Sequence, residues 1–212
     1  MFGKRLMTTQ QGGSAFNGGD FNGLEYQLVT NPTTGRVWLD RNLGANRVST
    51  SSSDSSSYGW LYQWGRLTDG HQIITSATTS TQSTTDVPIN GKFITGGNDW
   101  RYPSNNNLWQ GVDGINNPAP PGFRLPTEAE WNAERLSWSG DNSSSAFGSV
   151  LKLTATGYRV NNGSFNQSGT HGRYCSSSVS GTSQRYLFFD NRQTLFESTI
   201  RAFGFSVRCI KD

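Results

Sequence analysis

Arginine and large apolar side chains gather near the end of the chain, between residues 172 and 205. This mixture is typical of the residues that dominate the energy of protein contacts. Between Phe189 and Arg201 the apolar residues follow neither the strand period nor the helix period, so the pattern does not direct them toward a core. We therefore interpret residues 173–203 as a candidate ligand-binding surface; an ordinary loop with half-buried rings is the alternative. The candidate residues are Arg173, Cys175, Ser183, Arg185, Phe188, Asp190, Arg192, Leu195, Phe196, Ile200 and Phe203.

Other reactive side chains are sparse. The two cysteines, Cys175 and Cys209, give neither a disulfide framework nor a metal-ligand spacing. The histidines His71 and His171 have no neighbours at the spacing of metal ligands, and His71, next to Asp69-Gly70, is expected to be a structural residue. No Ser/His/Asp arrangement stands out. The sequence therefore predicts no enzyme, no catalytic residue, no metal and no cofactor.

The net charge is +3, and the whole excess lies after residue 171, because the preceding chain has twelve basic and twelve acidic residues. This location indicates either a mildly basic binding face or scattered solvated side chains. Neither alternative favours nucleic acid, since basic clusters and zinc-finger spacings are missing. The sequence has no apolar stretch of membrane-spanning length and begins without the apolar run of a signal peptide. We expect a virion or cell-surface location that is reached without Sec export.

The composition predicts an α+β or β protein rich in loops, because hydrophobic residues make up 33% of the chain while Gly, Ser and Asn are frequent. Seven Trp, seven Tyr and twelve Phe supply large rings for a core. The clearest element is a helix over 127–138, where Thr127 and Glu130 form a capping box and Pro126 ends a short strand before it.

The remaining elements are expected from local patterns. Residues 58–66 have helical spacing with rings toward the core; an exposed sugar-stacking platform is the alternative. Strands are expected at 25–29, 36–39, 150–153, 158–160, 186–189 and 203–210, with a hairpin between the first two and a turn at 161–164. Residues 48–57, 76–86 and 139–145 are expected to be loops, and 87–119 irregular. We divide the chain into an N-terminal extension, 1–22, which is an attachment segment, an ordered arm or a disordered tail, and a ligand-binding domain, 23–212.

The sequence Gly122-Phe-Arg-Leu-Pro-Thr-Glu-Ala-Glu-Trp131 resembles a signature of two families with the C-type lectin fold: formylglycine-generating-enzyme-like domains and Fibrobacter succinogenes major paralogous domains. The second resemblance is closer, since it extends in the same order to further blocks. These are VWLDRNLGA at 37–45, YGWLYQWGR at 58–66, DWR at 99–101, GYR at 157–159 and GFSVRC at 204–209. It implies an α+β fold with two helices, short antiparallel sheets, long irregular loops and a last strand that pairs with the first.

Some domains of this kind are variable proteins of diversity-generating retroelements, in which template adenines are copied promiscuously. An AAC codon altered at both adenines can give Arg, Cys, Phe, Leu, Ile, Asp, Ser or Tyr, but not Trp, Met, Lys, Gln or Glu. The candidate residues all belong to the reachable set, and all seven Trp lie outside the segment. Gln184, Gln193 and Glu197 would be fixed positions. The resemblance thus implies a viral receptor-binding display protein with a hypervariable surface at 173–203.

The chain departs from its relatives in its cysteines. Ala119 stands where relatives often have the partner of the cysteine in GFSVRC, so we expect two free thiols, with Cys209 buried and Cys175 at the surface; a Cys175–Cys209 disulfide is the alternative. A formylglycine-generating oxidase would need a closely spaced cysteine pair and an RGGSW block, and both are missing.

Calcium-dependent sugar binding would need a Glu-Pro-Asn motif, which is missing as well. A fixed-ligand or purely structural virion module remains open. The expected partner is a protein or glycan on a host or target surface, together with other virion proteins through residues 1–22.

Overall fold

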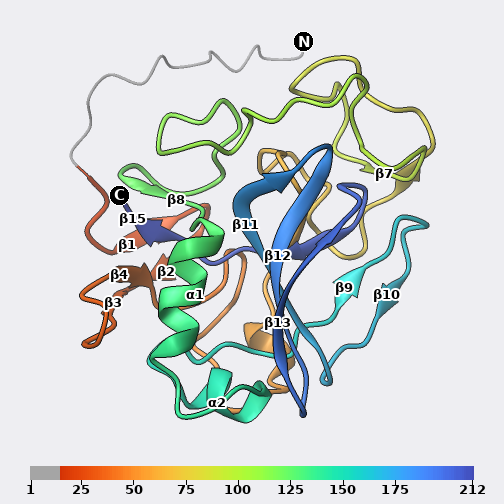
Figure 1. Cartoon of the computed structure of the whole chain (residues 1–212). Coiled ribbons are helices and arrows are strands. Elements are labelled where there is room, and N and C mark those ends of the chain that lie inside the picture. Colours follow the sequence, from red (N-terminus) through yellow and green to blue (C-terminus); the bar gives the residue numbers. More distant parts are fainter. Residues whose placement is uncertain (1–14) are drawn as a thin grey trace.

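Short strands joined by turns make up most of the chain, as the composition predicts. The computed structural model describes residues 15–212 (Figure 1), and within them the fold is α+β with two short helices and a 3-10 turn at Ser55–Ser57. The elements are β1 (Gly19–Phe21), β2 (Leu24–Tyr26), β3 (Leu28–Thr30), β4 (Val37–Leu39), β5 (Leu61–Gln63), β6 (Thr78–Thr79), β7 (Phe93–Ile94), β8 (Phe123–Arg124), α1 (Glu128–Leu136), α2 (Ser143–Gly148), β9 (Tyr158–Arg159), β10 (Phe165–Asn166), β11 (Gly172–Ser180), β12 (Ser183–Phe189), β13 (Thr194–Thr199), β14 (Gly204–Ser206) and β15 (Ile210–Lys211).

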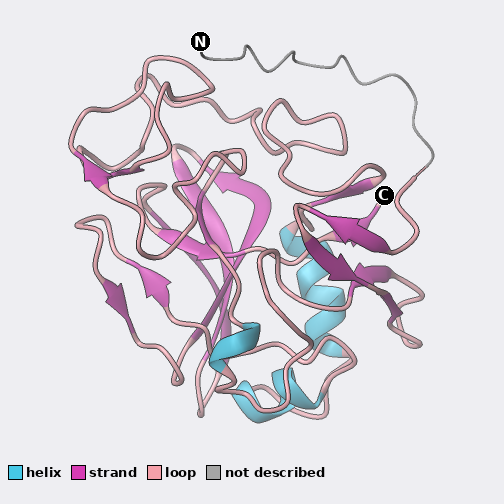
Figure 2. Ribbon diagram, turned by 180° about the vertical axis from the view of Figure 1, so that it is seen from behind, coloured by secondary structure: helices cyan, strands magenta, loops and turns pink. Residues whose placement is uncertain are grey.

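Two main sheets and two separate strand pairs, β1-β2 and β6-β7, organise these strands. The larger has the order β10-β9-β14-β11-β12-β13, and β5 also pairs with β14. The smaller has the order β3-β4-β15-β8, so the C-terminal strand lies between the first predicted hairpin and the strand before α1 (Figures 1 and 2). The resemblance implied pairing of the last strand with the first; β15 instead pairs with β4 and β8, while β1 pairs with β2.

Helix α1 begins as its sequence predicts. The Thr127 hydroxyl accepts the Glu130 amide N–H at 3.2 Å, and the Glu130 carboxylate accepts the Thr127 amide N–H at 2.8 Å, which completes the capping box. Arg124 donates to both oxygens of the same carboxylate, each at 2.8 Å. These bonds fix the angle at which the helix leaves β8.

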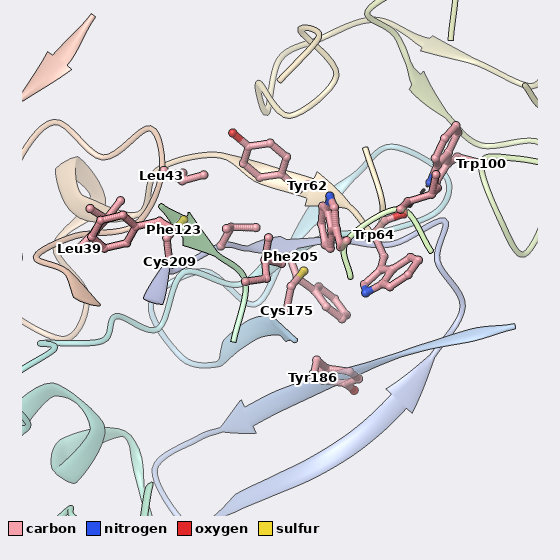
Figure 3. Packing of buried hydrophobic residues seen from close by; sticks show 14 of the residues in the cluster. Leu39, Leu43, Tyr62, Trp64, Trp100, Phe123, Cys175, Tyr186, Phe205 and Cys209 are labelled. Carbon is pink, nitrogen blue, oxygen red and sulfur yellow. Dashed lines mark hydrogen bonds between the residues drawn. The ribbon is translucent and has the colours of Figure 1, made fainter. Parts of the chain in front are cut away.

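One side of the β11–β12 pair packs against α1, which lies beside these strands in Figure 1. The core between them is mainly aromatic and contains Trp131, Trp138, Tyr174, Leu187 and Phe189, with Trp38 and Ile210 from the smaller sheet. A second buried cluster lies on the other side, under β14 and the long loops; it includes Tyr62, Trp64, Trp100, Trp109, Cys175 and Phe205 (Figure 3). The Trp residues outside 172–205 thus build the frame that holds this segment.

Several predicted elements are corrected by the structure. Residues 58–66 do not form a helix, since β5 occupies the middle of this segment and both Gly59 and Gly65 have positive φ values, 73° and 85°, that a helix does not permit. Within the predicted loop 139–145 the short helix α2 begins, with the Asn142 side chain accepting the Ser145 amide N–H. The predicted strand at 150–153 is absent, because Leu151 and Leu153 are buried without a strand partner and Lys152 is left-handed.

The strand at 158–160, the turn at 161–164 and the strand at 186–189 are confirmed. Part of the predicted N-terminal extension, residues 1–14, lies outside the described residues. Residues 15–22 contain β1, and Phe16 packs edge-on against Phe123 while its amide donates to the Pro121 carbonyl. This stretch is therefore an ordered arm on the domain.

Candidate ligand-binding face

Strands β11, β12 and β13 form an antiparallel meander whose side chains alternate between two faces. On one face, Arg173, Phe188 and Leu195 stand in a single row across the three strands. The next row on this face contains Cys175, Tyr186 and Glu197. Together with Tyr158 of β9 and with His171, these two rows are called the Arg173 face.

The Arg173 guanidinium is held by aromatic rings at the edge of this face. Its Cζ lies 4.0 Å from the centroid of the Tyr158 ring and 5.2 Å from that of Phe188, a geometry that attracts a cation to the ring faces. Its Nη1 donates to Gln167 Oε1 at 2.6 Å. Phe188 is only 7% exposed, whereas Leu195, at the far end of the row, is 40% exposed. The row therefore runs from a fixed cation to an exposed apolar side chain.

The second row contains a polar pair. The Tyr186 hydroxyl donates to Glu197 Oε2 at 2.6 Å. Burial raises the pKa of the Tyr186 phenol, and the bond to the Glu197 carboxylate raises it further. Tyr186 thus remains a hydrogen-bond donor at any physiological pH.

Beside Phe188, the His171 ring is tilted against the phenyl ring with centroids 5.6 Å apart. Burial lowers the pKa of His171, and the nearby positive charge of Arg173 lowers it further. At neutral pH, Arg173 is therefore the cation of this part of the face.

The opposite face of the meander, called the α1 face, holds two of the predicted ligand-binding residues. Arg185 makes an ion pair with Glu128 of α1, with Arg185 Nε 2.5 Å from Glu128 Oε2, and this hydrogen-bonded pairing raises the pKa of Arg185. Phe196 packs against the aromatic core under α1. Both side chains therefore brace the helix, and the structure does not bring them together with Arg173.

Three further candidates lie at the ends of the strands. Asp190 Oδ1 accepts the amide N–H groups of Arg192 and Gln193, which shapes the turn between β12 and β13 and lowers the pKa of Asp190. Arg192 is exposed in this turn, and Ser183 lies next to the turn between β11 and β12, paired with Ser180. These positions border both faces without joining the Arg173 row.

Ile200 and Phe203 follow β13 and return the chain toward β14. The side-chain amide nitrogen of the buried Gln184 donates to the backbone carbonyl oxygens of Ile200 and Phe203, at 3.0 and 3.3 Å. The Phe203 ring lies 5.7 Å from that of Tyr158, which places Phe203 beside the Arg173 face.

The expected surface position of Cys175 is wrong. Its side chain is completely buried between β11, β12 and the second core cluster, because the row that it shares with Tyr186 lies over Phe205 of β14. The expectation of a buried Cys209 is confirmed, and both thiols are free (Figure 3). Cys175 cannot touch a ligand in this arrangement.

Sequence reasoning did not assign Tyr158, His171 or Gln167 to the site and treated Glu197 only as a fixed position. The missing signal is the pairing of strands: β9 reaches Arg173 through β14, which no local pattern reveals. The alternation of Leu195, Glu197 and Thr199 along β13 could have placed Glu197 on the same face as Leu195. The apolar residues on both faces of this edge strand obscure that alternation in the sequence.

Strand β11 is also anchored outside the meander. Its register shifts between Cys175 and Val179, so that backbone groups at this bulge need other partners. The Trp64 indole donates to the Ser176 carbonyl at 2.9 Å, the Ser177 amide donates to the Pro126 carbonyl at 2.8 Å, and Gln110 donates to the Ser177 carbonyl at 2.7 Å. The blocks around Trp64 and Pro126 thus fix the strand that carries Arg173.

Two other polar features do not form sites. His71 Nδ1 is 2.6 Å from Asp69 Oδ1 and its Nε2 accepts the Gln63 amide N–H, so both ring nitrogens of this buried histidine are occupied, as expected for a structural residue. A pocket at the end of α1 is lined by Asn31, Trp138 and neighbouring serines, but the Asn31 side chain is already bonded to Glu134, Ser137 and the turn at 33–34.

Within residues 15–212, no group of three or more His, Cys, Asp or Glu side chains could hold a metal ion, and no helix is long and apolar enough to cross a bilayer. No family model, curated protein or solved structure matches the chain.

Proposed function

We propose that this protein is a non-enzymatic ligand-binding module with a C-type-lectin-like fold, and that the Arg173 face is its binding surface. The proposal rests on the difference between the two faces of the meander formed by β11, β12 and β13. One face is occupied by α1 and its aromatic core. On the other face, Cys175, Tyr186 and Phe188 are buried in the second core cluster, and the edges present a ring-held cation, an exposed aliphatic residue and a carboxylate. Such a mixture of an aromatic-held arginine and apolar area suits a contact surface.

The way in which the strands and helices are connected supports the fold assignment better than the number of helices and strands does. The C-terminal strand β15 returns to β4, a long irregular segment follows β5, and the capped helix α1 packs on the final strands. The blocks that carry the resemblance also meet inside the protein: the buried Arg208 of GFSVRC donates to Asn42 Oδ1 in VWLDRNLGA at 3.1 Å. Conserving such internal bonds while varying a surface is what a display scaffold requires.

The same proposal includes diversification by a retroelement and display on a virion or cell surface. The residues that the frame depends on, Trp64, Trp131 and Gln184, cannot arise from adenine replacement in AAC codons, whereas Arg173, Phe188 and Leu195 can. Within this proposal, we expect the variable positions to be accessible side chains of the Arg173 face and of the adjoining turns. A fixed-ligand or structural module is the competing account.

Sequencing codons 172–205 in a natural population that carries this gene tests the proposal. We expect substitutions to concentrate at positions 173, 195 and 203 and in the turns, while the buried positions 174, 187, 188 and 189 stay constant, because their side chains fill the two core clusters. An invariant segment, or substitutions spread equally over both faces, would contradict diversification and favour the competing account.

A further inference from the structure

The outer side of β13, called the β13 edge, is an open edge of the larger sheet. β13 ends this sheet and pairs along its whole length with β12, without a shift in register. Asp190 donates its amide N–H to the Gln193 carbonyl at 3.0 Å, so alternate residues from Gln193 onward direct their backbone groups toward β12. The residues between them, Thr194, Phe196 and Ser198, direct their N–H and C=O groups outward. Within residues 15–212, nothing is hydrogen-bonded to these outward groups.

The β13 edge carries none of the features that keep sheet edges from pairing. Folded proteins block such edges with proline, lysine, a bulge or a covering helix. The sequence of β13, Thr-Leu-Phe-Glu-Ser-Thr, contains neither proline nor lysine, and its pairing with β12 has no bulge. Helix α1 packs mainly on β11 and β12, and Leu195 and Ser198 of β13 are exposed. A strand edge of this kind is suited to pairing with a further strand.

The side chains of β13 favour a second copy of the same strand as that partner. An antiparallel pair with a two-fold axis at Phe196 uses every outward backbone group, because Phe196 then meets its own equivalent and Thr194 meets Ser198 of the other copy. The side chains that stand opposite one another are two phenyl rings, two pairs of hydroxyl groups, and Leu195 with Glu197 of the other copy. No like charges face each other in this register, and aromatic and hydroxyl pairs stabilise neighbouring strands.

The two neighbouring registers are less favourable. An axis at Glu197 places the two Glu197 carboxylates directly opposite each other, which destabilises a strand pair. An axis at Leu195 places Ser198 opposite Arg192, which lies in the turn before β13, so the outward groups of Ser198 lose their strand partner. The sequence of β13 therefore selects the axis at Phe196.

We infer that two copies of this chain pair through their β13 edges in antiparallel orientation, so that the two larger sheets become one continuous sheet. The two-fold axis of such a pair is perpendicular to the sheet, so both Arg173 faces lie on the same side of it. The pairing does not depend on the function proposed above. Combined with that function, it presents two binding surfaces in one direction, which allows bivalent attachment to a surface that carries several ligands.

Self-association of the full chain is measured by sedimentation velocity from about 1 to about 500 μM. Because the pairing forms backbone hydrogen bonds but buries little surface, we expect a monomer–dimer equilibrium with a Kd between about 1 and 100 μM. Hydrogen exchange followed by NMR locates the contact. Exchange at the amides of Phe196 and Ser198 is expected to slow at least about threefold at the highest concentration, while the inward amides of Leu195 and Glu197 serve as internal controls that are protected throughout.

Charge variants test the register. Leu195→Lys places an ammonium group opposite Glu197 of the other copy, and Leu195→Glu places a second carboxylate there. Each contact occurs twice across the axis, so we expect the Kd to fall at least about threefold in Leu195→Lys and to rise at least about threefold in Leu195→Glu.

A backbone variant tests the edge itself. Ser198→Pro removes an outward N–H that a single copy does not use, and Ser198→Ala keeps this N–H and is the matched control. We expect the Kd to rise at least about tenfold in Ser198→Pro and to stay unchanged in Ser198→Ala. Circular dichroism and thermal unfolding verify that each variant is folded.

A chain that stays monomeric up to about 500 μM would overturn the inference and leave the β13 edge to a different partner. Dimers that Ser198→Pro and Leu195→Glu leave unchanged, with unaltered exchange at Phe196, would assign self-association to another surface. Equal weakening by Leu195→Lys and Leu195→Glu would contradict the axis at Phe196. None of these results affects the codon test of the proposed function, so the two proposals fail separately.

Discussion

The Trp131 indole N–H donates to the carbonyl oxygen of Cys175 at 2.9 Å, and both groups are buried. Trp131 belongs to α1 and Cys175 to the strand that carries Arg173. Trp64 makes the equivalent bond to the next carbonyl, that of Ser176, from the other core cluster. The two indoles hold β11 at its bulge from separate sides, so the helix and the long loops jointly position the proposed binding face.

The Trp131 bond can be tested with Trp131→Phe and its neighbour Trp38→Phe. The two rings pack together with centroids 4.9 Å apart and both are buried, but Trp38 Nε1 has no hydrogen-bond partner among the described residues. Each substitution removes similar ring volume, and only Trp131→Phe leaves a buried carbonyl unsatisfied. We expect Trp131→Phe to lower the free energy of unfolding by about 1–3 kcal/mol more than Trp38→Phe, measured by urea denaturation. Equal losses would mean that the bond contributes nothing.

The parts of this frame that local chemistry determines were predictable from the sequence. The capping box of Thr127 and Glu130 and the turn at 161–164 need only neighbouring residues, and both are present. Resemblance added the connection between distant blocks, and residues such as Arg208 and Asn42 do meet.

What could not be predicted depends on strand pairing and burial. Residues 58–66 show helical spacing, yet the His71 ring and the Gln72 carbonyl bind this segment as an extended strand. Cys175 was expected at the surface because its row was unknown, and Arg185 and Phe196 were grouped with Arg173 because sequence proximity does not reveal the face. The register of three strands, set by long-range contacts, separates them.

Leu195 and Phe196 are neighbours that point to opposite faces of β13, which makes them a matched pair. The sequence analysis grouped Phe196 with the candidate ligand-binding residues, but its packing under α1 predicts an effect on stability. We expect Phe196→Ala to cost about 1–3 kcal/mol, because it removes a ring that packs under α1, and to keep ligand binding. Leu195→Ala should cost less than about 0.5 kcal/mol and weaken binding. Thermal unfolding of both variants provides the check; a loss of stability in Leu195→Ala as large as that in Phe196→Ala would argue against the assignment of faces.

The Phe189 ring occupies the space that a side chain at position 172 would need, so only glycine fits there. A Cβ at this position would lie 2.2 Å from the Phe189 ring, which core packing cannot absorb without a shift. Gly172→Ala is expected to destabilise the protein by about 1–3 kcal/mol, and adding Phe189→Leu should recover part of the loss. Additive losses in this double-mutant cycle, measured by denaturant unfolding, would show that the two positions do not interact.

Both thiols should be inert in the native protein. Cys175 and Cys209 are completely buried, and burial raises the pKa of each thiol well above its usual range, so neither supplies a thiolate for reaction. We expect less than about a tenth of the thiols to react with Ellman's reagent within minutes at pH 8, and both to react at once in 6 M guanidinium chloride, about the concentration that unfolds most domains. Rapid reaction of one thiol in the native state, absent in Cys175→Ser, would restore the surface position of Cys175.

The buried His71 ring should make stability depend on pH. Burial, together with the charge of Arg66, lowers the pKa of His71 to about 4, whereas an unfolded histidine titrates near pH 6.5. The folded state therefore favours the neutral ring, so its contribution is complete above pH 6.5 and is lost as the pH falls toward 4. Between pH 7 and pH 5 we expect a loss of about 2 kcal/mol in the free energy of unfolding, measured by urea denaturation. The slope should become flatter in His71→Gln and remain in His171→Gln, since His171 is partly exposed; an unchanged slope in His71→Gln would assign the pH dependence to other groups.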